Sequence, residues 1–170
     1  MNPKVVQTVM EMLHDRGYDV GDDFDPIIGY KGNESIKVYF IDLSKIGIKN
    51  INEVIDDMEA NHLDKSIIVS SGVLSSFGKQ LLTENKNIQL FHEDELSFNI
   101  TQHELVPEHK IVSKDETKEI MKKYNITAKQ FPRILQTDPV CRYHGGCPGD
   151  LFKILRESNN SKTVTYRLCV

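Results

Sequence analysis

The chain has 170 residues, 39% of them hydrophobic and 27% charged, which excludes a disordered segment and allows one ordinary domain or two small ones. No apolar run approaches the ~18 residues of a membrane helix, and residues 1–4 lack a signal-peptide pattern, so we expect an intracellular protein without membrane contact. Residues 1–100 hold 9 Lys and Arg against 17 Asp and Glu, whereas residues 101–170 hold 12 against 8, which indicates two domains and argues against broad phosphate binding by the first.

Helices and strands alternate along residues 1–95. Asn2 and Pro3 begin a helix that Gly17 ends. Short β-branched or aromatic runs predict strands at 36–41, 67–69 and 88–91, and helical stripes predict one helix that starts near Asn50 and another over 77–82. This order predicts an α/β domain with a mainly parallel sheet.

Residues 100–170 predict a small α+β domain with a terminal hairpin. Ser113 and Glu116 form a capping box for a helix that reaches about Tyr124. Asp138 and Pro139 begin a third, shorter helix after the capping box at Thr127. The last two strands are expected at 151–155 and 163–170, so the final strand ends with the chain and no tail is expected.

The cysteines raise the alternative of a zinc site. Cys141, His144 and Cys147 lie close together, with Cys169 as a fourth candidate ligand. Structural zinc sites use paired C-x₂₋₄-C elements, and this spacing is not one of them, so packing is the favoured interpretation. We expect no metal and no cofactor, and the sequence assigns no role to the cysteines.

A metal-dependent nuclease is the enzymatic alternative. Nucleases of the restriction type use an Asp followed downstream by Glu-x-Lys, in which the carboxylates hold Mg²⁺ and the lysine stabilises charge at the phosphate. Asp64, Glu84 and Lys86 match this bare pattern. Glu84 and Lys86 lie in a polar stretch that ends a helix, however, and not on a strand. No other catalytic motif stands out, which favours an assembly component over an enzyme.

Motifs spread along residues 99–170 resemble the small RNA polymerase subunit shared by eukaryotic polymerases I, II and III, which has a counterpart in archaeal polymerases. The matching stretches are Asn99-Ile100-Thr101, His103-Glu104-Leu105-Val106-Pro107-Glu108-His109, Tyr124, Pro132-Arg133-Ile134, Asp138-Pro139-Val140, Arg142-Tyr143, Pro148-Gly149-Asp150, Lys153-Ile154, Arg156 and Thr165-Tyr166-Arg167. Weaker matches in the first half are His14-Asp15-Arg16-Gly17-Tyr18, Gly47-Ile48-Lys49 and Ile67-Ile68-Val69. The resemblance therefore covers nearly the whole chain.

The resemblance implies a non-catalytic subunit with two roles. Residues 100–170 would dock onto the largest polymerase subunit and take part in assembly with other subunits. Residues 1–95 would form part of the lower jaw near downstream double-stranded DNA, with a nuclease-like fold that lacks catalytic residues. The partner-binding residues that the resemblance implies are His103, Leu105, Val106, Pro107, His109, Arg133, Arg142, Tyr143, Arg156, Tyr166 and Arg167.

The loop expected to face DNA departs from the family pattern Gly-x-Thr-Pro-Ser-Ala-Lys. Here Gly72 begins an eight-residue stretch that ends at Lys79, with the proline missing and one residue added. Ser75, Ser76 and Lys79 are expected to contact phosphates, and a helix cap is the alternative role for either serine. The short, divergent first half suggests a large DNA virus with its own polymerase. A cellular version would act in the nucleus, and a viral one in the host cytoplasm or the virion.

Overall fold

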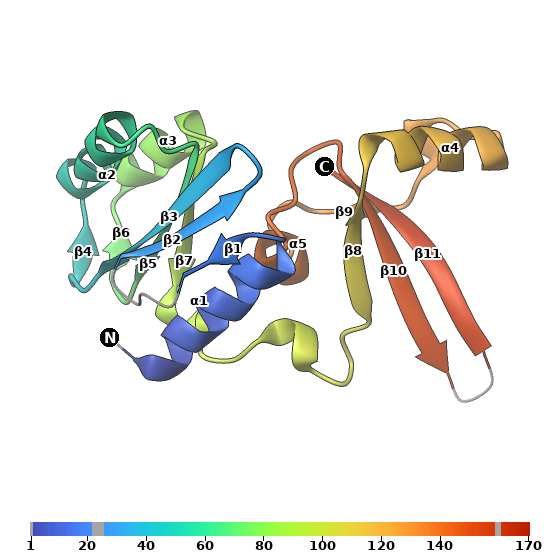
Figure 1. Ribbon diagram of the computed structural model, residues 1–170, viewed down its shortest axis with the longest axis horizontal. Coiled ribbons are helices and arrows are strands. Elements are labelled where there is room, and N and C mark those ends of the chain that lie inside the picture. The colour runs from blue at the N-terminus through green and yellow to red at the C-terminus, as the bar shows by residue number, and fades with distance from the viewer. Residues whose placement is uncertain (1, 22–25, 159–160) are drawn as a thin grey trace. The chain divides into compact units, whose positions relative to one another are not determined.

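A computed structural model describes residues 2–21, 26–158 and 161–170 (Figure 1). The chain divides into two compact units, Met1–Phe98 and Asn99–Val170. Each unit combines helices with a β-sheet, so the expected mixture of α and β elements is confirmed in both. Within the described ranges, no helix is long and apolar enough to span a bilayer.

A five-stranded sheet of order β1-β2-β3-β5-β7 lies at the centre of the N-terminal unit. The three predicted strands are β3, β5 and β7, and they are parallel neighbours as expected, whereas β1 and β2, which were not expected, add two antiparallel pairings and make the sheet mixed. β2 was not expected, because Gly29 interrupts its apolar run. A Cβ at Gly29 would lie 3.1 Å from Tyr18 Cβ and 3.2 Å from Ile36 Cγ2, so the close packing there favours glycine. The bounds are β1 Asp19–Val20, β2 Ile27–Lys31, β3 Glu34–Ile41, β5 Lys65–Ser70 and β7 Ile88–His92.

Three helices accompany this sheet: α1 Pro3–Asp15, α2 Ile48–Ala60 and α3 Ser76–Glu84. The predicted start of α1 is confirmed, since Asn2 Oδ1 accepts a hydrogen bond of 3.1 Å from Lys4 N. α2 begins at Ile48, two residues before the predicted start near Asn50. Gly47 is its N-cap, and Asn50 lies inside the first turn, where its Oδ1 accepts a hydrogen bond of 3.1 Å from Gly47 N. Asn is common both as an N-cap and inside the first turn, because its side chain can accept a hydrogen bond from an N–H group left free at a helix start, so the sequence does not distinguish the two positions.

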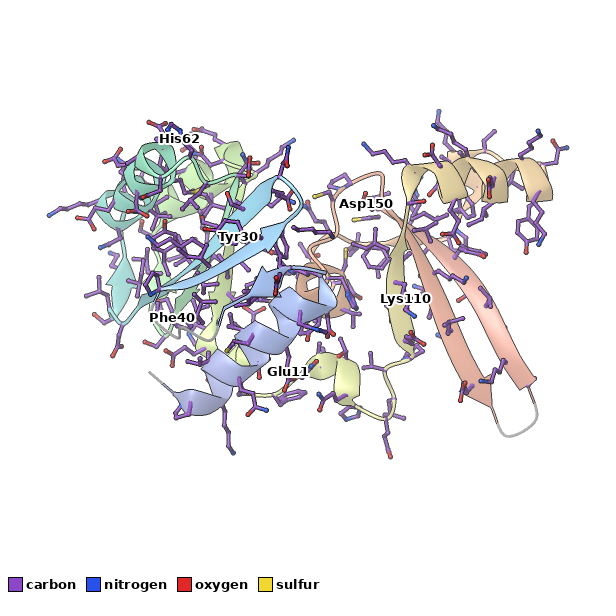
Figure 2. All side chains as sticks on the ribbon, in the orientation of Figure 1. Glu11, Tyr30, Phe40, His62, Lys110 and Asp150 are labelled. Atoms are coloured by element: carbon purple, nitrogen blue, oxygen red, sulfur yellow. The ribbon has the colours of Figure 1, made fainter. Side chains whose placement is uncertain are left out.

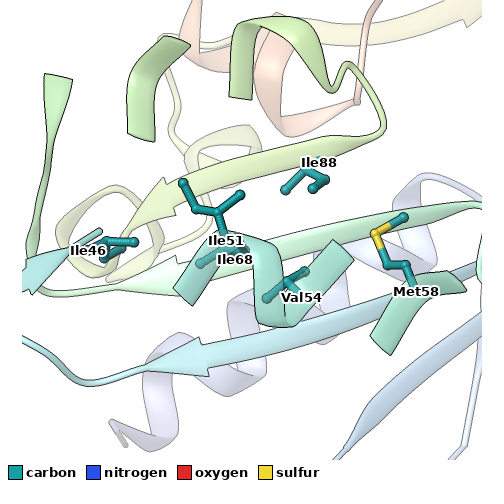
Figure 3. Close-up of a cluster of buried hydrophobic side chains, with 6 residues drawn as sticks. All are labelled: Ile46, Ile51, Val54, Met58, Ile68 and Ile88. Atoms are coloured by element: carbon teal, nitrogen blue, oxygen red, sulfur yellow. The ribbon is translucent and has the colours of Figure 1, made fainter. Parts of the chain in front are cut away.

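An aliphatic core joins α2 to the sheet (Figure 3). Its buried members are Ile46, Ile51, Val54, Met58, Ile68 and Ile88. Ile67 and Ile68 are both fully buried although neighbouring strand residues point to opposite faces, so the sheet is covered on both sides. α1 lies across the sheet from α2 and buries Val9, Met12 and Leu13 (Figure 1).

The C-terminal unit is built on a four-stranded sheet of order β8-β10-β11-β9. β10 and β11 form the predicted antiparallel hairpin, which is therefore confirmed. β8 was not expected, because most of its residues are exposed and its apolar and polar residues do not alternate. β9 is short and pairs in parallel with Leu168 and Cys169 only. The bounds are β8 Glu108–Val112, β9 Arg133–Ile134, β10 Leu151–Ser158 and β11 Ser161–Cys169.

The two α-helices in the described part of this unit start where the sequence predicted. Ser113 Oγ accepts a hydrogen bond of 3.2 Å from Glu116 N at the start of α4 Lys114–Tyr124. Asp138 Oδ1 accepts one of 2.9 Å from Val140 N at the start of α5 Pro139–Tyr143. Two small buried clusters hold the unit together: Val112, Ile120, Phe131 and Leu151, and Ile134, Cys141, Phe152 and Cys169.

Candidate docking surface and nucleic-acid loop

The loop expected to face DNA leads from β6 Val73–Leu74 into α3. Ser75 is the N-cap of α3, since its Oγ accepts a hydrogen bond of 3.0 Å from Gly78 N. Of the two roles left open for this serine, the helix cap is thus the one whose contact is present. The side chains of Ser76 and Lys79 are exposed and directed to solvent at the start of the helix.

Backbone packing fixes this loop where the family pattern would use proline. β6 pairs in parallel with β4 Lys45–Ile46, and a Cβ at the buried Gly72 would lie only 1.9 Å from Leu43 O. Val73 and Phe77 remain 72% and 70% exposed. The first turn of α3 has no acidic residue, so its partial positive charge is not offset there.

Three of the predicted partner residues line one pocket in the C-terminal unit. They are Leu105, Pro107 and Arg156, together with Glu104, Glu108, Leu155 and Glu157. A tight turn presents Leu105, which is 79% exposed: His103 Nδ1 accepts a hydrogen bond of 3.2 Å from Leu105 N, and Val106 N donates one of 2.9 Å to His103 O. Beside the pocket on β8, Lys110 Nζ lies 2.6 Å from Glu108 Oε1 (Figure 2).

A second group of predicted residues lies where β9 meets β11. Arg133 and Arg167 are exposed there, and Leu135, just past the end of β9, is 62% exposed. The half-buried Tyr166 packs its ring 6.5 Å from the ring of Tyr124 and 6.4 Å from that of Phe131. Desolvation by this packing raises the pKa of Tyr166, and the nearby phenol of Tyr124 adds to the effect.

Tyr143 needs a correction, because its side chain is only 2% exposed and cannot form part of a docking surface. One turn of α5 buries Val140, Cys141 and Tyr143 together and leaves Arg142 half-buried. His109 is also partly inside: its Nδ1 lies 2.6 Å from Pro107 O, and its ring packs against Phe152.

Packing explains two of the three cysteines, Cys141 and Cys169. Cys141 Sγ and Cys169 Sγ are 3.5 Å apart in the core, whereas Cys147 is exposed. Burial raises the pKa of both core thiols, which keeps them protonated, and for Cys141 the hydrogen bond with Cys169 adds to this effect. Among the residues that the structure describes, no group of three or more His, Cys, Asp or Glu side chains could hold a metal ion.

Asp64, Glu84 and Lys86 do not have the arrangement that a nuclease of the restriction type requires. Asp64 precedes β5, and its Oδ2 accepts hydrogen bonds of 2.8 Å from Ser35 N and 3.1 Å from Ser35 Oγ. Glu84 is the last residue of α3, and Lys86 follows in the turn before β7. Glu84 and Lys86 thus do not alternate along a strand, which is what the Glu-x-Lys arrangement needs.

The sequence analysis missed one feature of the C-terminal unit, the open edge of β11. β9 pairs with this strand at Leu168 and Cys169, and in the described part of the chain no other strand pairs with that edge. The β-branched run Thr163-Val164-Thr165 indicated a strand, but sequence alone does not say which edge of a strand is covered.

Comparisons with known proteins agree on one family. The family model described as "RNA polymerase Rpb5, C-terminal domain" matches residues 98–169. A relative from Dictyostelium discoideum, "DNA-directed RNA polymerases I, II, and III subunit rpabc1", is 41% identical over 143 residues, which cover 81% of this chain and 73% of the relative. Relatives named RPABC1 from Caenorhabditis briggsae and Caenorhabditis elegans are 32% and 33% identical over 199 aligned positions, which cover 98% of this chain and 94% of each relative.

Proposed function

This chain belongs to the Rpb5 family of RNA polymerase subunits, and from this premise we propose that it docks onto the largest subunit of a polymerase and lies near downstream DNA. The chain is a non-catalytic subunit of a multisubunit DNA-directed RNA polymerase, and its partners are other subunits of that enzyme. One observation carries the docking proposal. The family model matches residues 98–169, and these are almost the same residues as the C-terminal unit, Asn99–Val170.

Exposed side chains of the C-terminal unit support the docking role. Leu105 and Leu135 are large, apolar and mostly exposed, and arginines lie near each of them: Arg156 lines the pocket with Leu105, and Arg133 lies on β9 just before Leu135. Apolar anchors beside arginines are typical of protein interfaces, where water exclusion strengthens the contacts of the guanidinium group.

Deletion of residues 1–95 should leave the association with the polymerase intact, because the C-terminal unit has its own buried clusters and carries the proposed docking residues. The measurement is co-purification of the tagged fragment with the polymerase from the native host, compared with residues 1–98 as the control. Retention by residues 1–98 and loss by the deletion would overturn the assignment of docking to the C-terminal unit.

We propose that the N-terminal unit forms part of the lower jaw, with a nuclease-like fold that lacks catalytic residues. The proposal is supported by the parallel strands β3, β5 and β7 between helices and by the exposed Ser76 and Lys79 at the start of α3. Hydroxyl and ammonium donors beside a helix N-terminus suit phosphate oxygens of a passing duplex and carry no sequence preference.

A photo-crosslinker placed at Ser76 should react with downstream DNA in an elongation complex, and Lys79→Ala should lower the yield by about twofold or more through the loss of a phosphate contact. Lys86→Ala is the matched control, because Lys86 is exposed beyond the opposite end of α3. If position 76 gives no crosslink with DNA, the loop has no DNA role and Ser75 acts only as a helix cap.

We also propose that the chain is the version of a large DNA virus, active in the host cytoplasm or the virion, whereas a cellular version would act in the nucleus. Supporting this, alignment with the worm relatives needs 199 positions for a chain of 170 residues, so these relatives contain segments that this chain lacks. The co-purification above tests the idea, since the large subunits that it recovers are encoded either by a virus or by the host. Host-encoded large subunits would exclude the viral origin.

A further inference from the structure

On one side of β11, the backbone groups face an edge that β9 covers in part, and no other strand of the described residues covers it. Leu168 N donates a hydrogen bond of 2.8 Å to Pro132 O on the β9 side, whereas Cys169 N donates one of 2.8 Å to Asp150 O on the β10 side. Successive residues of a strand direct their N–H and C=O groups to alternate sides. The N–H and C=O groups of Lys162, Val164 and Tyr166 therefore point to the same side as those of Leu168, where the described part of the chain places no partner strand.

The hairpin around this edge extends past the rest of its sheet. β8 pairs with Leu151–Leu155 only, so Arg156–Ser158 of β10 and Ser161–Thr163 of β11 form a two-stranded ribbon, whereas Val164 and Tyr166 lie opposite the part of β10 that β8 also pairs with (Figure 1). Residues 161–165 are all exposed, which means that no layer covers either face of β11 there. A two-stranded ribbon with bare faces is only marginally stable in water, so a third strand would stabilise it.

Two of the features that normally keep strands from pairing with other chains, a proline and a bulge, are absent from residues 161–167. Such edges are usually blunted by proline, by a bulge or by free lysines. Here the pairing with β10 is regular from Ser161 to Leu168, and the one lysine, Lys162, is held by Glu157 with its Nζ 2.6 Å from Oε1. The run Thr163-Val164-Thr165 between them is rich in β-branched residues, which favour a strand.

We propose that the edge of β11 formed by residues 161–167 binds an extended segment of another polymerase subunit as an added β-strand. This rests on the proposed docking function of the C-terminal unit. An extended segment can form main-chain hydrogen bonds with a row of N–H and C=O groups along a strand edge. Its side chains on one face would contact Val164 and Tyr124, which are 44% and 54% exposed. The added strand would lie beside β11 on the same edge as β9, and it would end next to Arg133, the first residue of β9.

Val164→Pro tests this edge directly. Proline removes the Val164 N–H, which faces the open side, and breaks no hydrogen bond with β10, so the hairpin should still form. We expect the affinity of the full chain for polymerase purified without this subunit to fall by about tenfold or more, because the added strand loses a backbone donor and meets the proline ring. Val164→Thr is the matched control, because it keeps the N–H and the β-branched shape, and it should bind within about twofold of the natural chain.

Hydrogen exchange of the natural chain gives a second measurement that does not depend on how well the proline variant folds. The amides of Val164 and Tyr166 should exchange slowly in the assembled polymerase and rapidly in the free chain. Equal exchange in both states, or unchanged affinity of a folded Val164→Pro chain, would overturn the added strand. A dimer of the free chain that Val164→Pro dissociates would show that a second copy is the occupant, which also overturns it. Failure of the natural chain to bind the polymerase at all would instead contradict the proposed function.

Discussion

Phe152→Ala should lower the free energy of unfolding of the C-terminal unit by about 3–5 kcal/mol, the usual cost of removing a buried phenyl ring. Phe152 is fully buried and shares a cluster with Ile134, Cys141 and Cys169. The rings of His109 and His144 pack at its edges with centroids 6.4 Å away. Cys141 of α5 and Cys169 of β11 both lie in this cluster, so the cavity removes contacts that hold α5 to the end of β11.

Urea unfolding followed by circular dichroism measures this change on the C-terminal unit. Leu135→Ala is the control, because Leu135 is 62% exposed, and it should change the stability by no more than about 0.5 kcal/mol. A loss below about 1 kcal/mol for Phe152→Ala would show that the cluster does not hold the unit together. Because a small unit has little stability to spare, the variant should also lose its association with the polymerase.

Gly72→Ala should destabilise the N-terminal unit by about 3 kcal/mol or more, at the upper end of the cost of overpacking. The new Cβ would lie 1.9 Å from Leu43 O and 3.0 Å from the carbonyl carbons of Leu43 and Ser44. These are backbone atoms, so no side-chain rotation relieves the contact, and β4 and β6 must separate. Since β6 leads directly to Ser75, the position of the proposed DNA loop should change as well.

Thermal unfolding of the N-terminal unit tests the effect, with Gly21→Ala as the matched control. Within the described residues, a Cβ at Gly21 meets no atom within 4 Å, so this change should stay within about 0.5 kcal/mol of the natural chain. Gly72→Ala should reduce crosslinking from position 76 and leave co-purification with the polymerase unchanged. Stability equal to that of the Gly21→Ala chain would mean that the loop is not held by β4.

Some of the residues predicted for the docking surface are exposed, but the sequence did not predict which of them are buried. Leu105, Pro107 and Arg156 do line one pocket, although Arg156 lies on a different strand, far along the chain from the other two. Tyr143 is buried, and the sequence did not predict this. A helix of a single turn is too short for its pattern of apolar residues to show which side is buried. The alternation of helices and strands predicted the parallel strands of the first unit, but it gave no sign of the antiparallel β1 and β2, whose strand signals are weak.

The sequence by itself determined the local contacts of this protein. The caps at Asn2, Ser113 and Asp138 join groups two or three residues apart, so residue type and spacing suffice to predict them. The motifs along residues 99–170 likewise identified the family without coordinates. Tertiary structure alone decided the rest, because strand pairing and burial depend on residues far apart in the chain. Only the fold brings Cys141 to Cys169, presses Gly72 against Leu43 and leaves the edge of β11 open.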